Sequence, residues 1–225
     1  MNDFRRFSDR ADAGRQLAAA LKAKAYADPV VLALPRGGVP VALEVSRIIH
    51  APLDLVLVRK IGVDSQPELA AAAVVDGDHP EIVINEDVVK AAGVSQRYLD
   101  VQFQARLADI AGLRQLYLKD RARVAIKGRT VIVIDDGIAT GASIRAALHG
   151  LRAKNPARLV LAVPVAPAET LAELGEESDE ITCLATPEPF FAISAHYTDF
   201  RQVGDDEVVA MLAAADAVKS ASPSG

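Results

Sequence analysis

The chain has 225 residues, a formal net charge of −5 at pH 7 and a hydrophobic fraction of 51%. This composition supplies enough apolar side chains for a sizeable core and argues against a largely disordered protein. The negative net charge gives no electrostatic reason to expect nucleic acid as a partner, because binding to its phosphates needs clustered lysines and arginines.

The charged N-terminus and the lack of a long apolar run indicate a soluble protein. The first residues, MNDFRRFSDRADAG, are charged and lack the apolar segment of a signal peptide. No apolar run approaches the roughly 20 residues that a membrane span needs. Cys183 cannot form an intramolecular disulfide, which is compatible with a reducing compartment. We therefore expect a soluble, cytoplasmic protein with no membrane partner.

The first quarter of the chain predicts a strand–helix–strand unit. An amphipathic helix is expected to start near Ser8 or Asp9. Residues 30–34 (VVLAL) form an apolar run between two prolines, which is typical of a buried strand. Residues 39–49 have helical apolar spacing, and residues 53–58 (LDLVLV) predict a second buried strand. Such a unit favours a parallel sheet.

The next segments predict a loop, a hairpin and a long helix. Residues 59–70 (RKIGVDSQPELA) are polar and contain Gly and Pro, which indicates a long loop. The apolar runs 71–75 and 82–84 predict a hairpin around an Asp-Gly-Asp turn. Residues 95–119 predict a helix that begins with a capping serine and spans roughly 37 Å. We expect this long helix to pack across the domain or against another subunit, which would make the protein a homo-oligomer.

The rest of the chain alternates between strands and helices. Strands are expected at 130–134, 158–163 and 180–184, and helices at 144–152 and 168–174. This alternation predicts a single α/β domain over residues 1–218, with a central, mainly parallel sheet flanked by helices. Residues 219–225 (KSASPSG) are small and polar, and we expect a disordered tail there.

Residues 131–143, VIVIDDGIATGAS, carry the most specific chemistry in the chain. Four apolar residues lead to Asp135 and Asp136 at the carboxyl end of a predicted strand, where ligands bind in open α/β sheets. Two adjacent carboxylates repel each other unless cationic or hydroxyl groups lie beside them. The vicinal hydroxyls of a ribose are suitable donors.

The second half of this segment predicts an anion site. A tight turn precedes the start of a helix, where free backbone N–H groups and the helix dipole bind anions. Side-chain hydroxyls can add hydrogen bonds to phosphate oxygens. The candidate phosphate-binding residues are Gly137, Ile138, Ala139, Thr140, Gly141, Ala142 and Ser143. The alternative is an ordinary strand, turn and capped helix without a ligand.

The segment VIVIDDGIATGAS resembles the 13-residue motif with which type I phosphoribosyltransferases bind 5-phosphoribosyl 1-pyrophosphate (PRPP). In that family the two acids hold the ribose 2- and 3-hydroxyls, and the following loop takes the 5-phosphate. The resemblance implies the type I phosphoribosyltransferase fold with a small hood, expected here from the N-terminus and residues 185–203. The patterns RGGVPVA, RKIG, PELA, VPVAP and TPEPFFA extend it, over roughly residues 4–210, to a bacterial subgroup of phosphoribosyltransferase-domain proteins.

Two further segments are candidates for binding pyrophosphate. LPRGGVP resembles the family's pyrophosphate loop: Gly37 and Gly38 let the backbone approach an anion, and Arg36 adds charge. In the family this loop often contains a cis non-proline peptide. Arg59 and Lys60 follow the second predicted strand and suit a pyrophosphate leaving group, with Lys60 as a catalytic candidate. The alternative for these two is a solvated basic pair.

Residues 61–69 resemble the flexible loop that closes over the reaction centre in this family. Closure would exclude water from a transition state that resembles an oxocarbenium ion. Glu68 in this loop could stabilise that cation or act as a base, although Gln66-Pro67-Glu68 could equally start a helix.

Aromatic residues near the C-terminus are candidates for stacking on an acceptor base, with core packing as the alternative. They are Phe190, Phe191, Tyr197 and Phe200. Ala139 stands where hypoxanthine-type enzymes carry an aspartate that interacts with purine N7. The motif therefore disfavours a 6-oxopurine acceptor that is recognised by that carboxylate.

We therefore predict a pentosyltransferase of nucleotide salvage that moves 5-phosphoribosyl from PRPP to a nitrogen acceptor, such as a nucleobase, and releases pyrophosphate. Mg²⁺ is expected on PRPP itself, near Asp135 and Asp136, and not in a dedicated protein cage. The expected partners are small molecules. The alternatives are a PRPP- or nucleotide-sensing regulator without transfer activity, and a hydrolytic or phosphorolytic variant.

Overall fold

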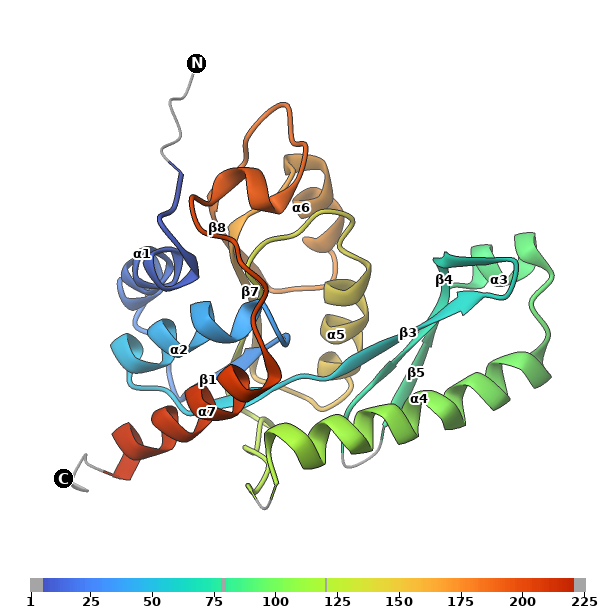
Figure 1. Cartoon of the computed structure of the whole chain (residues 1–225), viewed down its shortest axis with the longest axis horizontal. Helices are drawn as coiled ribbons and strands as arrows, with labels where there is room; N and C mark the ends of the chain where they lie inside the picture. The colour runs from blue at the N-terminus through green and yellow to red at the C-terminus, as the bar shows by residue number, and fades with distance from the viewer. Residues whose placement is uncertain (1–5, 78–79, 120, 221–225) are drawn as a thin grey trace.

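The computed structural model describes residues 6–77, 80–119 and 121–220, without the side chains of residues 67–68 and 217–220 (Figure 1). Its centre is a five-stranded sheet with strand order β2-β1-β6-β7-β8. All four neighbouring pairs are parallel. The strands are β1 (Pro29–Ala33), β2 (Leu53–Leu55), β6 (Thr130–Ile134), β7 (Arg158–Val165) and β8 (Glu180–Ala185). This confirms the predicted central parallel sheet.

Helices cover both faces of the sheet (Figure 1). They are α1 (Arg10–Lys22), α2 (Gly38–Ile49), α5 (Ala142–Arg152), α6 (Ala168–Leu174) and α7 (Asp205–Ser220). Successive strand residues point to opposite faces, so Ile132 and Ile134 pack with α1, α2 and α7, whereas Val131 and Val133 pack with α5 and α6. Both faces of β6 are therefore buried, which explains the continuous apolar sequence of its residues 131–134.

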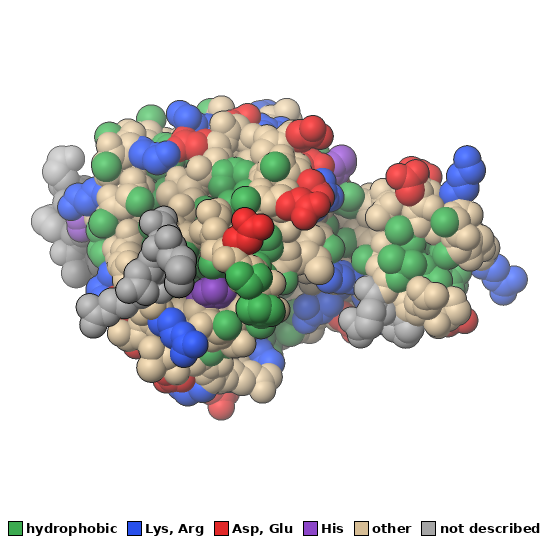
Figure 2. Space-filling view, turned by 90° about the horizontal axis from the view of Figure 1, so that it is seen from above, with side chains coloured by type: hydrophobic (Ala, Val, Ile, Leu, Met, Phe, Trp, Pro, Cys, Tyr) green, Lys and Arg blue, Asp and Glu red, His purple; other side chains and the backbone are tan. Residues whose placement is uncertain are grey.

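A three-stranded antiparallel sheet projects from the main body as an arm. It contains β3 (Val58–Val63), β4 (Gln66–Val75) and β5 (Glu81–Ile84). From above, the arm forms a separate, smaller lobe (Figure 2). The prediction of a long loop at residues 59–70 is therefore wrong, and so is the prediction of an uninterrupted strand at 53–58, because β2 ends at Leu55 and β3 begins at Val58. The hairpin predicted between 71–75 and 82–84 is confirmed by the pairing of β4 with β5.

Two helices complete the arm: α3 (Glu86–Ala92), which was not predicted, and α4 (Gln96–Tyr117). The long helix is confirmed, since the Ser95 hydroxyl accepts a hydrogen bond from the backbone N–H of Tyr98 at its start. It runs along the arm toward the main body (Figure 1). Its buried Leu99 and Ile110 pack in the same cluster as Ile61 of β3. That burial explains why the predicted loop is a strand.

The two ends of the described chain flank the main body. Residues 7–9 run beside residues 196–199, where Thr198 N donates to Phe7 O (2.8 Å) and Asp199 N donates to Ser8 O (2.9 Å). We call residues 6–9 and 186–203 the hood; it lies above the sheet in Figure 1.

Helix α7 runs to Ser220, so the predicted tail cannot begin at 219, and residues 221–225 lie outside the described part. No helix of the described residues is long and apolar enough to cross a membrane.

Candidate functional site

The two acids of the motif lie where β6 ends, beside the end of β1. Asp135 is partly exposed, whereas Asp136 is only 8% exposed. The backbone N–H of Asp136 donates to Asp135 Oδ1 over 2.8 Å. The pair therefore stands at the carboxyl edge of the sheet, as predicted for ligand-binding residues in open α/β folds.

Asp136 is held by residues from distant parts of the chain. Arg10 Nε of α1 donates to Asp136 Oδ2 over 2.7 Å, and both side chains are almost fully buried. The Tyr197 hydroxyl of the hood donates to the backbone oxygen of Asp136 over 2.5 Å. Sequence reasoning did not find Arg10, because it lies 126 positions from Asp136 and belongs to no local motif.

Burial and mutual repulsion make the acid pair costly when both carboxylates are ionised. Burial raises the pKa of Asp135 well above its usual value, and the neighbouring charge of Asp136 raises it further. Burial also raises the pKa of Asp136, although the guanidinium of Arg10 opposes this shift. Such a pair favours a ligand that brings hydrogen-bond donors or positive charge.

The glycines of LPRGGVP lie directly against the acid pair. A Cβ atom built on Gly37 would lie 2.1 Å from Asp136 Oδ2, and one on Gly38 would lie 2.7 Å from the backbone oxygen of Ile134. Only glycine fits such approaches without displacing its neighbours. The peptide bond between Pro35 and Arg36 is cis. The loop thus lies in contact with the carboxylates that follow β6.

Arg36 meets α4 and α7 at this edge. Its Nη1 lies 3.5 Å from Asp205 Oδ1, and the same carboxylate oxygen accepts a hydrogen bond from the Tyr117 hydroxyl over 2.6 Å. Burial, followed by the contact with Asp205, raises the pKa of Tyr117 to about 12, while the charges of Arg36 and Arg59 lower it. The structure therefore brings the two predicted arginines, Arg36 and Arg59, near one tyrosine.

Lys60 does not share this position. Arg59 and Lys60 are neighbours in β3, and successive side chains of a strand point to opposite faces. Lys60 is exposed, whereas Arg59 lies on the face of Ile61, which packs against α4. Arg59 and Lys60 therefore lie in a strand of their own, β3, and not in a loop after the second strand as predicted.

The phosphate-loop candidates connect β6 to α5. Ala139 and Thr140 are exposed at the tip of the turn. Gly141 adopts a left-handed conformation (φ +72°), and no described side chain caps the start of α5. Backbone N–H groups at that end therefore lack a side-chain acceptor, as an anion site requires. Ile138 N donates to Val165 O (2.9 Å) and the Thr170 hydroxyl donates to Ala139 O (3.0 Å), which fix the turn to its surroundings.

The acceptor candidates lie in different environments. Phe191 is 82% exposed, and Phe190 is half-buried with its ring stacked on His196 at 5.4 Å between centroids. Tyr197 is only 3% exposed and packs against Phe7. Its ring is therefore part of the core of the hood and has no free face for a base, which corrects its assignment as a stacking residue.

The segment compared with a flexible loop, residues 61–69, forms the turn end of the β3–β4 hairpin. The backbone of Glu68 lies in β4 and not at a helix start. Its side chain lies outside the described part of the structure.

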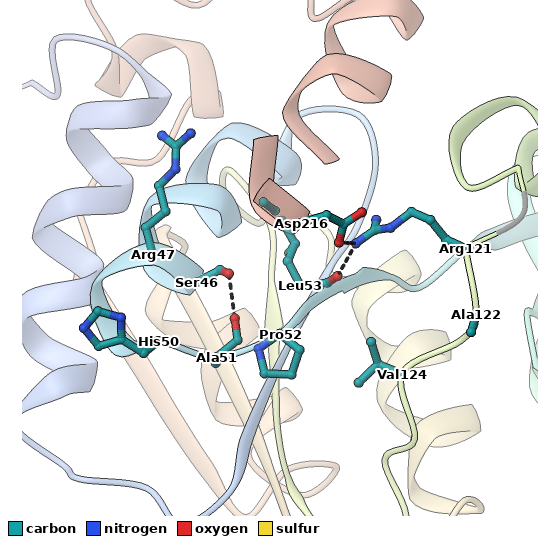
Figure 3. Close-up of a pocket in the computed structure, with 11 residues that line it drawn as sticks. Ser46, Arg47, His50, Ala51, Pro52, Leu53, Arg121, Ala122, Val124 and Asp216 are labelled. Atoms are coloured by element: carbon teal, nitrogen blue, oxygen red, sulfur yellow. Dashed lines mark hydrogen bonds and ion pairs between the residues drawn. The ribbon is translucent and has the colours of Figure 1, made fainter. Parts of the chain in front are cut away.

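A cavity of about 410 Å³ lies away from this site, at the opposite edge of the sheet (Figure 3). It lies between the C-terminal end of α2, the start of β2 and α7, and its lining includes His50, Leu53 and Arg121. Arg121 Nη2 donates to Asp216 Oδ1 (2.6 Å) and to Leu53 O (3.2 Å). None of the cavity's lining residues belongs to the motif or the glycine loop.

The fold and the site define an α/β protein with an acid pair and a tight turn before a helix at the carboxyl edge of a parallel sheet. Residues 6–197 match the model of the phosphoribosyl transferase domain. The chain therefore belongs to this family, which confirms the resemblance seen in the sequence.

Individual relatives agree with this assignment. The chain is 44% identical over 206 residues to "Putative phosphoribosyl transferase Rv0571c" and to "Putative phosphoribosyl transferase MT0597", from two strains of Mycobacterium tuberculosis. These matches cover 92% of this chain and 46% of each relative, so the chain spans about half their length. The crystal structure of TT1426 from Thermus thermophilus is 42% identical, with a TM-score of 0.78, and the match covers 92% of this chain and 97% of that one. This similarity confirms the fold.

Proposed function

We propose that this chain transfers a 5-phosphoribosyl group from PRPP to a nitrogen acceptor, such as a nucleobase, and releases pyrophosphate. The observation that carries the proposal is the contact between the glycine loop and the acid pair. Gly37 and Gly38 approach Asp136 and the end of β6 so closely that no side chain fits between them. A ribose at the acids would thus have its 1-pyrophosphate beside this loop and its 5-phosphate beside the turn at residues 137–143.

Each part of the site then has a separate task. Asp135 accepts hydrogen bonds from the ribose hydroxyls, which stabilises the ionised carboxylate and offsets the repulsion from Asp136. The backbone N–H groups at the start of α5 bind the 5-phosphate. Arg36 and Arg59 attract the pyrophosphate, whose negative charge grows as the bond to the ribose breaks. Because ribose is held at several points, the reacting carbon is fixed relative to the acceptor.

Mg²⁺ fits this arrangement as a companion of PRPP. Carboxylate oxygens are the ligands that this ion prefers, and burial together with the neighbouring charge of Asp136 raises the pKa of Asp135, so that a cation beside it would stabilise the ionised carboxylate. Asp135 would hold the ion from the protein side, and the ion would neutralise charge on the departing pyrophosphate. The described acids, histidines and Cys183 form no metal-binding group of three or more, so we propose no site built from the protein alone.

The second candidate function is a PRPP- or nucleotide-sensing protein that binds without transfer. The position of Lys60 favours it, because this candidate catalytic residue lies on the face of β3 opposite to Arg59. The donor half of the site does not distinguish the two functions, since both require recognition of the phosphoribosyl group.

The proposal is tested by incubating the protein with PRPP, Mg²⁺ and a panel of bases while pyrophosphate release is measured. Release that depends on one base supports transfer. Binding of PRPP without turnover on any base supports the sensor, and release without a base supports a hydrolase. The double variant Asp135→Asn, Asp136→Asn should abolish PRPP binding, whereas Asp109→Asn, an exposed position on α4, should leave it unchanged. Retained affinity in the double variant would refute the assignment of the motif.

A further inference from the structure

Arg10 connects the hood to the acid pair. It is the first residue of α1, and its side chain is 11% exposed although arginine is rarely buried. Its Nε donates to Asp136 Oδ2 over 2.7 Å. A buried arginine paired with one of the two motif acids is unusual enough to need an explanation, because removing two charges from water is costly.

Contacts with the hood fix the orientation of this guanidinium. Nη1 of Arg10 donates to the backbone oxygen of Arg201 over 2.8 Å. The guanidinium carbon lies 3.8 Å from the centroid of the Phe200 ring, within the range of a cation–π interaction. Arg10 is thus held by an acid of the motif and by two consecutive residues of the hood. A planar group held at several points has little freedom to rotate.

The two acids of the motif therefore differ. Oδ2 of Asp136 is occupied by Arg10, and the close approach of Gly37 covers the same oxygen. Asp135 is more exposed; its Oδ1 accepts a backbone N–H from Asp136, and the carboxyl groups of the two acids also lie within hydrogen-bonding reach of each other. Besides Asp135 and Arg10, the ionisable group described against Asp136 is Tyr197, whose hydroxyl donates to the Asp136 backbone oxygen, while the guanidinium of Arg36 is directed to Asp205.

We propose that Arg10 is a positioning residue for ribose recognition, which fixes Asp136 beneath the hood so that Asp135 is presented to the ribose hydroxyls. This inference rests on the proposed function, because it assigns the acid pair to a ribose. Without Arg10, the Asp136 carboxylate would lose its only described cationic contact closer than 4 Å and could turn toward Asp135. The geometry of both acids would then change, while Arg36, which is held by Asp205, and Arg59, which lies in β3, would stay in place.

The inference is tested with ligands that contain ribose and one that does not. Calorimetric titrations with PRPP, ribose 5-phosphate and pyrophosphate, each with Mg²⁺, compare wild type with Arg10→Gln. We expect affinity for both ribose ligands to fall about tenfold or more, while affinity for pyrophosphate changes less than about twofold. Arg10→Lys, which keeps the charge, should restore part of the loss. The control Arg15→Gln removes an arginine from the same helix whose side chain is 53% exposed, and should change nothing.

A second variant covers the case in which Arg10→Gln does not fold. Phe200→Leu keeps the ion pair but removes the ring beneath the guanidinium, and should weaken both ribose ligands several-fold and spare pyrophosphate. Equal losses for all three ligands, or no loss for any, would overturn the inference. If wild type binds neither ribose ligand, both the proposed function and this inference are refuted. If wild type binds both ribose ligands, and Arg10→Gln and Phe200→Leu bind them with the same affinity, only the inference is refuted and the proposed function stands.

Discussion

The contact between Gly37 and Asp136 predicts that a side chain at position 37 destabilises the folded protein. In Gly37→Ala the new Cβ would lie 2.1 Å from Asp136 Oδ2, 2.6 Å from its Cγ and 3.0 Å from its Oδ1. Gly37 has φ −60°, which alanine adopts easily, so the backbone conformation does not oppose the substitution. The cost is therefore steric, and it falls on one carboxylate.

The Asp136 carboxylate has little room to move away. It accepts a hydrogen bond from Arg10 over 2.7 Å, and the backbone oxygen of Asp136 accepts one from the Tyr197 hydroxyl. Overpacking of this kind costs about 1–3 kcal/mol of unfolding free energy. For a chain of this size that corresponds to a fall in Tm of roughly 2–12 °C. Because the displaced acid belongs to the proposed ribose site, affinity for PRPP should fall with it.

A matched control uses the same substitution where space is available. Gly112 lies on the exposed side of α4, and a Cβ there would meet nothing within 4 Å. Gly112→Ala should stabilise the helix by about 0.5–1 kcal/mol and leave PRPP binding unchanged. Thermal unfolding and calorimetric PRPP titration measure both effects. If Gly37→Ala matched Gly112→Ala in Tm and in affinity, the close packing of the glycine loop on Asp136 would be refuted.

Two other substitutions test the same centre. Asp135→Asn removes a carboxyl whose pKa is raised in the fold. A carboxyl with a raised pKa stabilises the folded state below its ordinary pKa, and this contribution is lost as pH rises through the raised value. The variant should therefore gain stability relative to wild type as pH increases across that window while losing PRPP affinity; a stability difference that does not vary with pH in chemical denaturation would contradict the shift. Tyr197→Phe leaves the Asp136 carbonyl without its hydroxyl donor and should lower the unfolding free energy by about 1–2 kcal/mol, whereas an unchanged midpoint in urea would show that water replaces the hydroxyl.

The elements whose burial is dictated by local sequence could be predicted. The run before Asp135 is apolar at every position because both faces of β6 are covered, and that pattern belongs to a buried parallel strand. The arm could not be predicted in the same way. Residues 60–63 alternate between more exposed and buried positions, with Ile61 and Val63 inward, and this alternation is visible only once α4 is placed against them.

In the candidate site, too, some residues could be predicted from the local sequence and others could not. The turn after Asp136 and the close approach of the loop glycines could be predicted, because tight turns and close backbone contacts depend on short-range sequence. Asp205 and Arg10 could not, since each reaches the site from a terminal helix and neither lies in a pattern that signals a ligand. Tyr197 was found as an aromatic near the site, but its burial depends on Phe7 at the other end of the chain.

Asp136 shows why local and distant residues both decide the chemistry of this site. The motif places two carboxylates side by side, and burial then disfavours their ionised forms. Arg10 compensates one of them, which leaves Asp135 as the acid whose charge is least balanced within the fold. A ligand with vicinal hydroxyls or an accompanying cation would supply what the protein lacks at that position. Part of the binding free energy would therefore come from relieving an unfavourable interaction that folding leaves in place, and this contribution should disappear in Asp135→Asn, although its hydrogen-bonding oxygen remains.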